Sequence, residues 1–284
     1  MKTVSRIDDL RRRCDAARAE GAEIGFVPTM GSLHEGHRSL LRAARADTDV
    51  VVASIFVNSL QFGPGEDFAA YPRDLDTDSA MAADDGVDLL FVPSSAEMYP
   101  TDPLTTVHVS GLTRGLCGAS RPTFFDGVAT VVTKLLSIVG PCRAYFGRKD
   151  YQQFAVVKRL VADLDLPVEV VGCPLVREPD GVAMSSRNAY LDGDTRARAT
   201  VLYEALSSVV DAVQEGERNA RLLRDRLADL VSREPALTLD YADVVDATTL
   251  APVSGNRRGD RGRGRRRRGR RPAHRQHDDP RRWR

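Results

Sequence analysis

The amino-acid sequence predicts an α/β protein with a doubly wound parallel sheet, followed by a second, smaller α+β domain. Short apolar runs rich in β-branched residues alternate, over residues 5–171, with segments whose apolar residues recur at helical spacing. Repeated crossovers of this kind build a parallel sheet with helices on both faces, which binds ligands at the carboxyl ends of its strands. Beyond residue 176 this alternation ends, and two longer helical patterns follow.

The individual elements follow from spacing and from their start and stop signals. A first amphipathic helix is expected over residues 5–20, with Ser5 and Asp8 at capping-box spacing and Gly21 as a stop. Strands are expected at 24–27, 50–57, 87–92, 143–146 and 168–171, and further helices at 37–45, 75–85, 127–139 and 151–164. In the second domain, helices over 195–215 and 219–233 precede one strand over 237–245. The predicted domains are therefore 1–176 and 177–254, with a tail over 255–284.

Composition indicates a globular protein. The 284 residues are 42% hydrophobic and 29% charged, which is enough to bury a sizeable core. No apolar run approaches membrane-spanning length and the first ten residues lack a secretory pattern, so a soluble, cytoplasmic protein is expected. The four cysteines form no C-x-x-C pair, which favours free thiols over a disulfide frame or a zinc site: Cys14, Cys117, Cys142 and Cys173.

The charge is unevenly distributed. From Arg257 to the end there are 14 Arg and 3 Asp, a surplus of 11, so the formal charge of +1 leaves −10 for residues 1–256. Residues 261–271 are Arg and Gly alone, a composition that cannot bury a core. We interpret 255–284 as a disordered tail produced by a frameshift near Ser254 or Gly255, because a GC-rich gene read out of frame often encodes Arg and Gly.

Residues 28–37 join a predicted buried strand to a predicted helix. A helix that begins there directs its free N–H groups and the positive end of its dipole at a ligand above the strand, which suits a phosphate chain. His34 and His37 are three residues apart, so on a helix they share a face and could donate to one phosphate. This spacing excludes the H-E-x-x-H zinc motif, whose two histidines are four residues apart. In the alternative interpretation, Gly31 and Gly36 shape a turn and the histidines are ordinary surface residues.

Two other strand ends also carry polar residues. Asn58 and Gln61 follow the strand at 50–57, and residues 147–150 follow the strand at 143–146. Because the carboxyl ends of parallel strands lie at one edge of a sheet, the three sets of side chains are expected to meet there.

Five segments occur in the order and with the spacing of one family. They are PTMGSLHEGH, IFVNSLQFGPGEDFAAYPRD, FDGVATVVTKLL, AYFGRKDYQQFAVVKRLVADL and VREPDGVAMSSRNAYL. Over residues 23–191 the chain therefore resembles the pantothenate synthetase family, within the nucleotidyltransferases that carry an H-x-G-H signature. The resemblance implies a Rossmann-like N-terminal domain closed by a small lid domain. It also implies condensation of (R)-pantoate with β-alanine by ATP, through a pantoyl adenylate, in the synthesis of the coenzyme A precursor pantothenate.

The resemblance assigns roles by matching positions. His34, His37 and Lys149 are the expected catalytic residues, with His37 at the family's proton-donor position; Lys149 supplies a compact cation. Gln61 and Gln153 match the pantoate-binding positions, and Gln61 also faces β-alanine. The expected ATP-binding residues are Met30, Gly31, Ser32, Leu33, His34, Glu35, Gly36, His37, Gly147, Arg148, Lys149, Asp150, Val176, Met184, Ser185, Ser186 and Arg187. Mg²⁺ is expected as the counter-ion of ATP, without a protein metal cage, and the family is usually homodimeric.

The chain departs from the family pattern in several places. Phe124 stands where the family has a histidine, Arg148 where it has Glu, and Ser59 where it has Pro. The first change removes a polar contact and the second adds a cation near the phosphates. The family's small domain also continues beyond the strand at 237–245 with apolar strands that the Arg/Gly run does not supply, so the lid is expected to be truncated.

Two other functions remain open from the sequence. One is a different nucleotidyltransferase of the H-x-G-H group, although the matches to the pantoate-binding positions at Gln61 and Gln153 disfavour it. The other is nucleic-acid binding through the basic tail, because Arg-rich tails bind RNA electrostatically. Such tails normally interleave aromatic residues, and here the tail has Trp283 alone.

Overall fold

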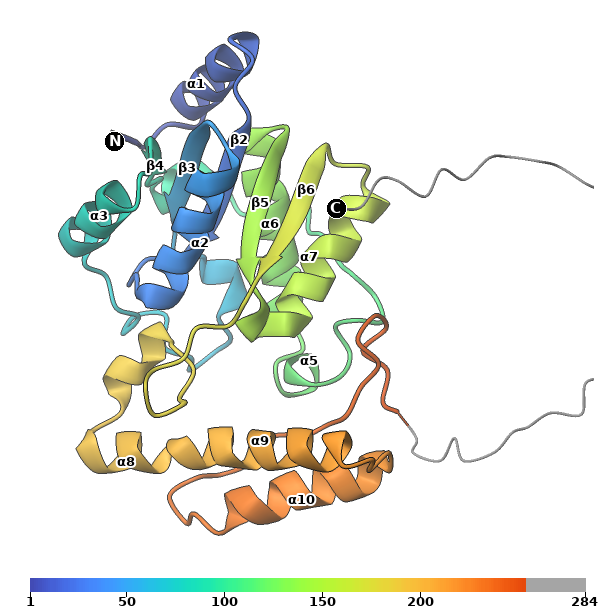
Figure 1. Ribbon diagram of the computed structural model, residues 1–284. Helices are drawn as coiled ribbons and strands as arrows, with labels where there is room; N and C mark the ends of the chain where they lie inside the picture. The colour runs from blue at the N-terminus through green and yellow to red at the C-terminus, as the bar shows by residue number, and fades with distance from the viewer. Residues whose placement is uncertain (254–284) are drawn as a thin grey trace, which may run out of the picture.

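The computed structural model describes residues 1–253, so the predicted tail over 255–284 lies outside the described residues (Figure 1). The strands are β1 (Lys2–Val4), β2 (Ile24–Thr29), β3 (Val50–Ile55), β4 (Leu89–Phe91), β5 (Cys142–Gly147) and β6 (Val168–Cys173). The helices are α1 (Ile7–Ala19), α2 (Glu35–Asp47), α3 (Leu75–Asp84), α4 (Ser95–Met98), α5 (Cys117–Ser120), α6 (Phe124–Val139), α7 (Tyr151–Asp163), α8 (Gly193–Arg198), α9 (Thr200–Gln214) and α10 (Ala220–Ser232). Short 3-10 turns lie at η1 (Ser59–Gln61), η2 (Arg148–Asp150) and η3 (Ser186–Tyr190).

The sheet is parallel throughout and doubly wound, as predicted. Its strand order is β1-β4-β3-β2-β5-β6. From β2 the chain moves outward to β3 and β4, then returns to the other side of β2 for β5 and β6. The winding therefore reverses between β2 and β5, and in such sheets a ligand crevice lies at the carboxyl ends of the strands at that point.

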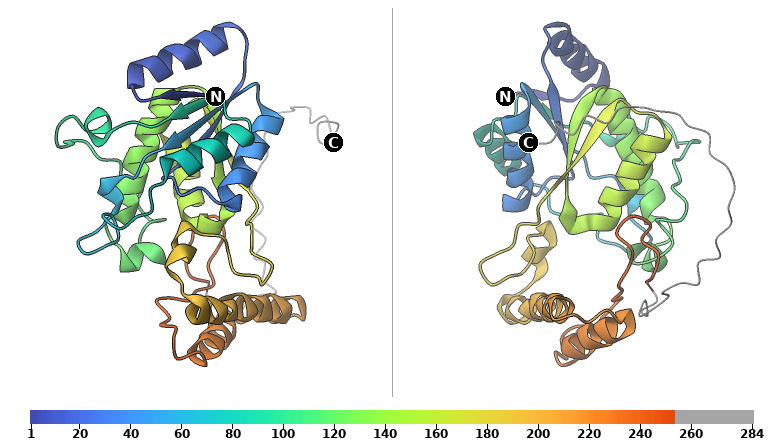
Figure 2. Two further views of the ribbon diagram at one scale, coloured as in Figure 1. Left: turned by 90° about the vertical axis from the view of Figure 1, so that its left-hand side faces the viewer. Right: turned by 45° about the vertical axis from the view of Figure 1, so that its right-hand side comes forward.

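Two apolar layers enclose the sheet. Alternate strand residues point to opposite faces, so Phe26 and Phe146 pack with α1, α6 and α7, whereas Val27 and Tyr145 pack with α2 and α3. Figure 2 shows these helices on both sides of the sheet. Burial of both faces explains why the strands are almost continuous apolar runs rather than alternating ones.

The start of the chain differs from its prediction. α1 begins at Ile7, and its N-cap Arg6 makes no side-chain cap, so the predicted capping box at Ser5 is wrong. The first helical amide is bound instead by a distant carboxylate, since Ile7 N donates to Glu97 Oε1 at 2.8 Å. The preceding residues form β1, which pairs with β4 and is too short to show a periodic pattern.

The C-terminal region also differs. The predicted helix over 195–215 is divided at Ala199 into α8 and α9, and α9 packs beside α10 below the sheet (Figure 1). The predicted strand over 237–245 is wrong: it contributes one isolated bridge, from Val245 to Pro252. A strand requires a neighbour for its ladder of hydrogen bonds, and the described part of this region offers helices and isolated bridges.

The other predicted helices and strands start and end within three residues of their predicted limits, whereas α4 and α5 were not predicted. Among residues 1–253, the helices are all too short or too polar to cross a bilayer.

A glycine brings α6 close to the turn after β3. A Cβ atom at Gly127 would lie 2.2 Å from the carbonyl oxygen of Leu60, which is backbone and cannot move aside cheaply. We expect Gly127→Ala to lower the free energy of unfolding by roughly 2–4 kcal/mol, because either the helix or the turn must shift. Urea denaturation measures this change. Gly193→Ala is the control, since its Cβ would meet nothing within 4 Å; equal stability of the two variants would contradict the prediction.

Candidate active site

A cavity of about 480 Å³ opens at the carboxyl ends of β2 and β5, where the winding of the sheet reverses. The turns after β2, β3 and β5 and the segment 174–187 contribute to its walls. It brings together most of the site residues predicted from the sequence: Met30, His34, Gly36, His37, Gln61, Gly147, Lys149, Asp150, Gln153, Val176, Met184, Ser185, Ser186 and Arg187.

Two adjacent imidazoles, with their rings tilted by 36°, lie at the N-terminus of α2. The ring centroids of His34 and His37 are 4.1 Å apart. His34 is the N-cap residue, and its Nδ1 accepts a hydrogen bond from Gly36 N at 3.1 Å. In the neutral ring the proton therefore resides on Nε2, which leaves that nitrogen as a donor. His37 Nδ1 is buried and has no hydrogen-bond partner within residues 1–253.

Both imidazoles are neutral at pH 7. Burial, with contributions from His34 and Lys149, lowers the pKa of His37 to about 3. Burial and then the Lys149 charge also lower the pKa of His34. In the ligand-free cavity His37 is thus a hydrogen-bond donor rather than an acid that releases a proton.

This pKa predicts an acid-dependent loss of stability. Below a pH of about 6.5 the unfolded chain protonates His37, whereas the native chain keeps it neutral down to about 3. The unfolded state then binds more protons, so the free energy of unfolding falls as the pH drops through this window, by up to about 1.4 kcal/mol per pH unit. Denaturation at several pH values should show a shallower slope for His37→Gln. Equal slopes for the two proteins would contradict the assigned pKa.

The cation Lys149 follows β5 on the turn η2. Its Nζ lies 3.2 Å from Asp150 Oδ1, and its side chain is about one third exposed. An ammonium group in the wall of a cavity offers a compact positive charge to a bound anion.

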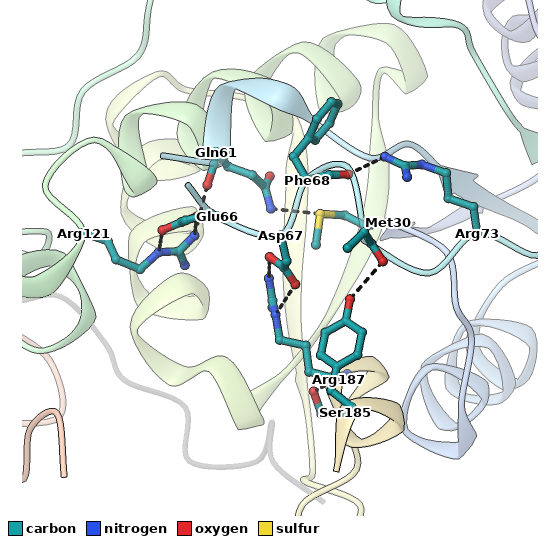
Figure 3. Close-up of polar contacts among 11 residues, drawn as sticks. Met30, Gln61, Glu66, Asp67, Phe68, Arg73, Arg121, Ser185 and Arg187 are labelled. Atoms are coloured by element: carbon teal, nitrogen blue, oxygen red, sulfur yellow. Dashed lines mark hydrogen bonds and ion pairs between the residues drawn. The ribbon is translucent and has the colours of Figure 1, made fainter. Parts of the chain in front are cut away.

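The guanidinium of Arg187 is clamped by a carboxylate. Its Nε and Nη2 donate to the two oxygens of Asp67, each at 2.9 Å (Figure 3). This pairing holds the pKa of Asp67 below its usual range. Beside it, Ser186 Oγ donates to the carbonyl oxygen of Ser32 at 2.9 Å. The segment that carries Arg187 is thereby joined to the turn after β2, and an anionic ligand would have to compete with Asp67 for the guanidinium.

The amide of Gln61 is oriented by its neighbours. Gln61 Oε1 accepts from Asn58 Nδ2 at 3.2 Å, and Gln61 Nε2 donates to Met30 Sδ at 2.9 Å (Figure 3). Asn58 is itself fixed, because its Nδ2 also donates to the Gly127 carbonyl oxygen and Tyr99 OH donates to its Oδ1. Asn58 is buried behind Gln61 rather than in the cavity wall.

Five predicted ATP-binding residues do not line the cavity: Gly31, Ser32, Leu33, Glu35 and Arg148. The amides of Ser32 and Leu33 donate to the Asp78 carboxylate at 2.8 and 2.7 Å, and Glu35 pairs with Arg42. The amides of Ser32 and Leu33 are therefore not free in this structure, and neither are Gly36 N and His37 N, which both bond to His34. These groups shape the turn that presents the imidazoles.

Several cavity residues were not predicted. Gln152 is buried and holds the loop before α5, since its Oε1 accepts from Cys117 N and its Nε2 donates to the carbonyl oxygens of Leu112 and Gly115. A glutamine that simply precedes Gln153 in the sequence gives no signal for this role. Tyr241 reaches the cavity from the far end of the chain.

Phe124, which replaces the family's histidine, has a defined place. It lines the cavity and lies under the guanidinium of Arg121, whose Cζ is 3.9 Å from the ring centroid. Arg121 also pairs with Glu66 and donates to the carbonyl oxygen of Gln61 (Figure 3). The aromatic ring thus supports the arginine that fixes the turn carrying Gln61.

The described residues 1–253 contain no group of three or more His, Cys, Asp or Glu arranged to hold a metal ion. The donors of the cavity are instead imidazoles, amides, an ammonium and the guanidinium groups of Arg121 and Arg187, which suit a phosphate chain. A doubly wound parallel sheet with such donors at its reversal point defines a nucleotide-binding α/β protein.

Comparison with known proteins identifies the family. A family model described as pantoate-beta-alanine ligase matches residues 2–264. Pantothenate synthetase from Caldicellulosiruptor saccharolyticus is 52% identical over 254 residues, 89% of this chain and 90% of that protein. The crystal structure of pantothenate synthetase from Thermus thermophilus superposes with a TM-score of 0.84 at 49% identity, covering 89% and 90% of the two chains. The chain belongs to the pantoate–β-alanine ligase family.

A third relative carries ligands. The pantoate-beta-alanine ligase of Francisella tularensis, solved in complex with beta-gamma ATP and beta-alanine, superposes with a TM-score of 0.71 at 36% identity. That match covers 81% of this chain and 86% of the Francisella chain.

Proposed function

We propose that this chain joins (R)-pantoate to β-alanine at the expense of ATP and releases pantothenate, AMP and diphosphate. The observation that carries the proposal is that His34, His37, Lys149 and Arg187 line one cavity with Gln61 and Gln153, in a member of this ligase family. The cavity thus combines donors for a polyphosphate with neutral amides for a hydroxy acid. Neutral amides bind a carboxylate without the strong charge pairing that would weaken it as a nucleophile.

In the first step, a carboxylate oxygen of pantoate attacks the α-phosphorus of ATP. A carbon–oxygen–phosphorus anhydride forms, and the bond from the α-phosphorus to the bridging oxygen breaks to release diphosphate. The negative charge on the departing oxygens grows during this step, so donors positioned there accelerate it. We assign this role to His34 Nε2–H, to His37 and to Lys149. Mg²⁺, which accompanies ATP, would neutralise part of the phosphate charge without a protein cage.

In the second step, the amine of β-alanine attacks the acyl carbon of the pantoyl adenylate. A carbon–nitrogen bond forms, and the bond between the acyl carbon and the bridging phosphate oxygen breaks. AMP leaves, and the nitrogen loses a proton. Gln61 lines the cavity and is oriented by Asn58, which supports assigning its amide the role of holding the substrates at the reacting carbon.

A coupled assay tests the function. Diphosphate should appear with Mg-ATP and pantoate, and AMP should appear in amounts equal to pantothenate when β-alanine is added. A different nucleotidyltransferase of the same fold would instead transfer the nucleotide to another phosphate-bearing substrate. Failure of pantoate to stimulate diphosphate release, under conditions in which the folded chain binds ATP, would contradict the proposal.

Further features remain proposals. We infer that residues 1–176 bind nucleotide and pantoate, and that 177–254 form a small lid whose closing segment carries Ser186 and Arg187. A cytoplasmic homodimer follows from the family resemblance and is tested by light scattering. The basic tail and its frameshift origin concern residues outside the described part of the chain, and sequencing the gene tests the latter.

A further inference from the structure

The segment that follows α10 returns to the sheet domain. In Figures 1 and 2 the chain after α10 leaves the two lid helices and rises beside α5 and α7. Two hydrogen bonds fix it there: Ser120 Oγ donates to Asp240 Oδ1 at 2.8 Å, and Tyr151 OH donates to the carbonyl oxygen of Ala247 at 3.0 Å. The segment thus lies against the sheet domain although it follows the two helices α9 and α10 in sequence.

A third contact joins the same segment to the lid helices. Arg224 of α10 pairs with Asp243, with Nη1 and Oδ1 3.2 Å apart. The segment is therefore attached to α5 at Asp240, to α10 at Asp243 and to α7 at Ala247. Movement of α10 would move this segment relative to the cavity.

Tyr241 lies between these attachments and lines the cavity. Partial burial, followed by the electrostatic effect of Cys117, Asp240 and Asp150, raises the pKa of its hydroxyl. The side chain is about half exposed, at 47%. Tyr241 thus lies at the rim, near Asp150 of the predicted nucleotide site and near the loop before α5.

The proposed reaction requires that water be kept away from the acyl adenylate. In a pantoyl adenylate the acyl carbon is electrophilic, so water can attack it. The water oxygen then bonds to the acyl carbon, and the bond between that carbon and the bridging phosphate oxygen breaks. The products are pantoate, AMP and a proton, and the ATP is consumed without pantothenate. Exclusion of water prevents this side reaction.

Resting on the proposed function, we propose that Tyr241 is a specificity-determining residue whose ring covers the acyl adenylate and favours attack by the amine over attack by water. It is delivered by the C-terminal segment, which links the lid helices to the cavity. The aromatic ring supplies the cover, because a large rigid side chain excludes solvent from a half-open rim at low cost in conformational entropy.

The division of the pantoyl adenylate between attack by the amine and attack by water tests this role. With the full chain, Mg-ATP, pantoate and limiting β-alanine, the ratio of AMP to pantothenate is measured for the wild-type protein, Tyr241→Ala and Tyr241→Phe. We expect the ratio to rise by roughly threefold to tenfold in Tyr241→Ala and to stay near its original value in Tyr241→Phe, which keeps the ring. Leu239→Ala is the matched control, since it changes the same segment away from the cavity wall.

Binding provides a second readout that does not depend on turnover. A sulfamoyl analogue of the pantoyl adenylate, titrated calorimetrically, should bind Tyr241→Ala about tenfold more weakly than the wild-type chain and bind Leu239→Ala equally well. Wild-type protein that releases no AMP would contradict the proposed function. Active wild-type protein with an unchanged ratio in Tyr241→Ala, or unchanged affinity of that variant for the analogue, would overturn the role of Tyr241.

Discussion

Replacing His37 by alanine is expected to lower kcat by about 10²–10³-fold, with a smaller effect on the KM for pantoate. His37 Nδ1 is buried, lies without a partner in the described chain, and lines the cavity next to His34 and Lys149. Loss of one donor to a developing oxyanion has an effect of this size. Steady-state rates of AMP formation, and pre-steady-state release of diphosphate, measure it.

His108→Ala is the matched control for this variant. His108 is exposed and pairs with Asp126, away from the cavity wall, so its removal should leave kcat unchanged. A His37→Ala protein that folds normally and retains a wild-type rate of diphosphate release would remove His37 from the chemistry.

Replacing Lys149 by alanine is the second large effect. We expect a loss of about 10²-fold or more in kcat/KM for ATP, because the ammonium lines the same cavity and its charge acts on both imidazoles. Lys149→Arg should recover little of the rate, since a planar guanidinium does not replace a compact point charge. Initial rates at varied ATP concentration measure both variants.

Lys158→Ala serves as the control for Lys149. Lys158 lies on α7, is exposed and does not contribute to the cavity. Lys158→Ala therefore removes one positive charge, as Lys149→Ala does, but at a site away from the cavity. If both lysine variants lost the same activity, the effect would come from net charge rather than from a contact with phosphate.

Local patterns were sufficient to predict the sheet and the meeting of its strand ends. The β-branched run of β3 and the helical spacing after His34 are each readable within a short window. The rule that ligands bind at the carboxyl ends of parallel strands then placed His34, Gln61 and Lys149 together, and they do line one cavity.

Features that depend on distant partners were not predictable in this way. The cap of α1 comes from Glu97, 90 residues away, and the amides before His34 are bound by Asp78, 45 and 46 residues away. Local capping and helix-dipole signals therefore do not identify the partners of these amides. Tyr241 reaches the cavity through a segment whose apolar pattern predicts a strand, but in the described residues this segment forms one isolated bridge.

The central claim is that two imidazoles, one ammonium and one guanidinium surround the same triphosphate. A crystal structure of this chain with a non-hydrolysable ATP analogue tests it most directly. We predict the phosphates between the rings of His34 and His37 and the Lys149 ammonium, with Arg187 turned from Asp67 toward the nucleotide. Phosphates bound elsewhere, with the Asp67–Arg187 pair intact and the imidazoles free of ligand, would contradict the account.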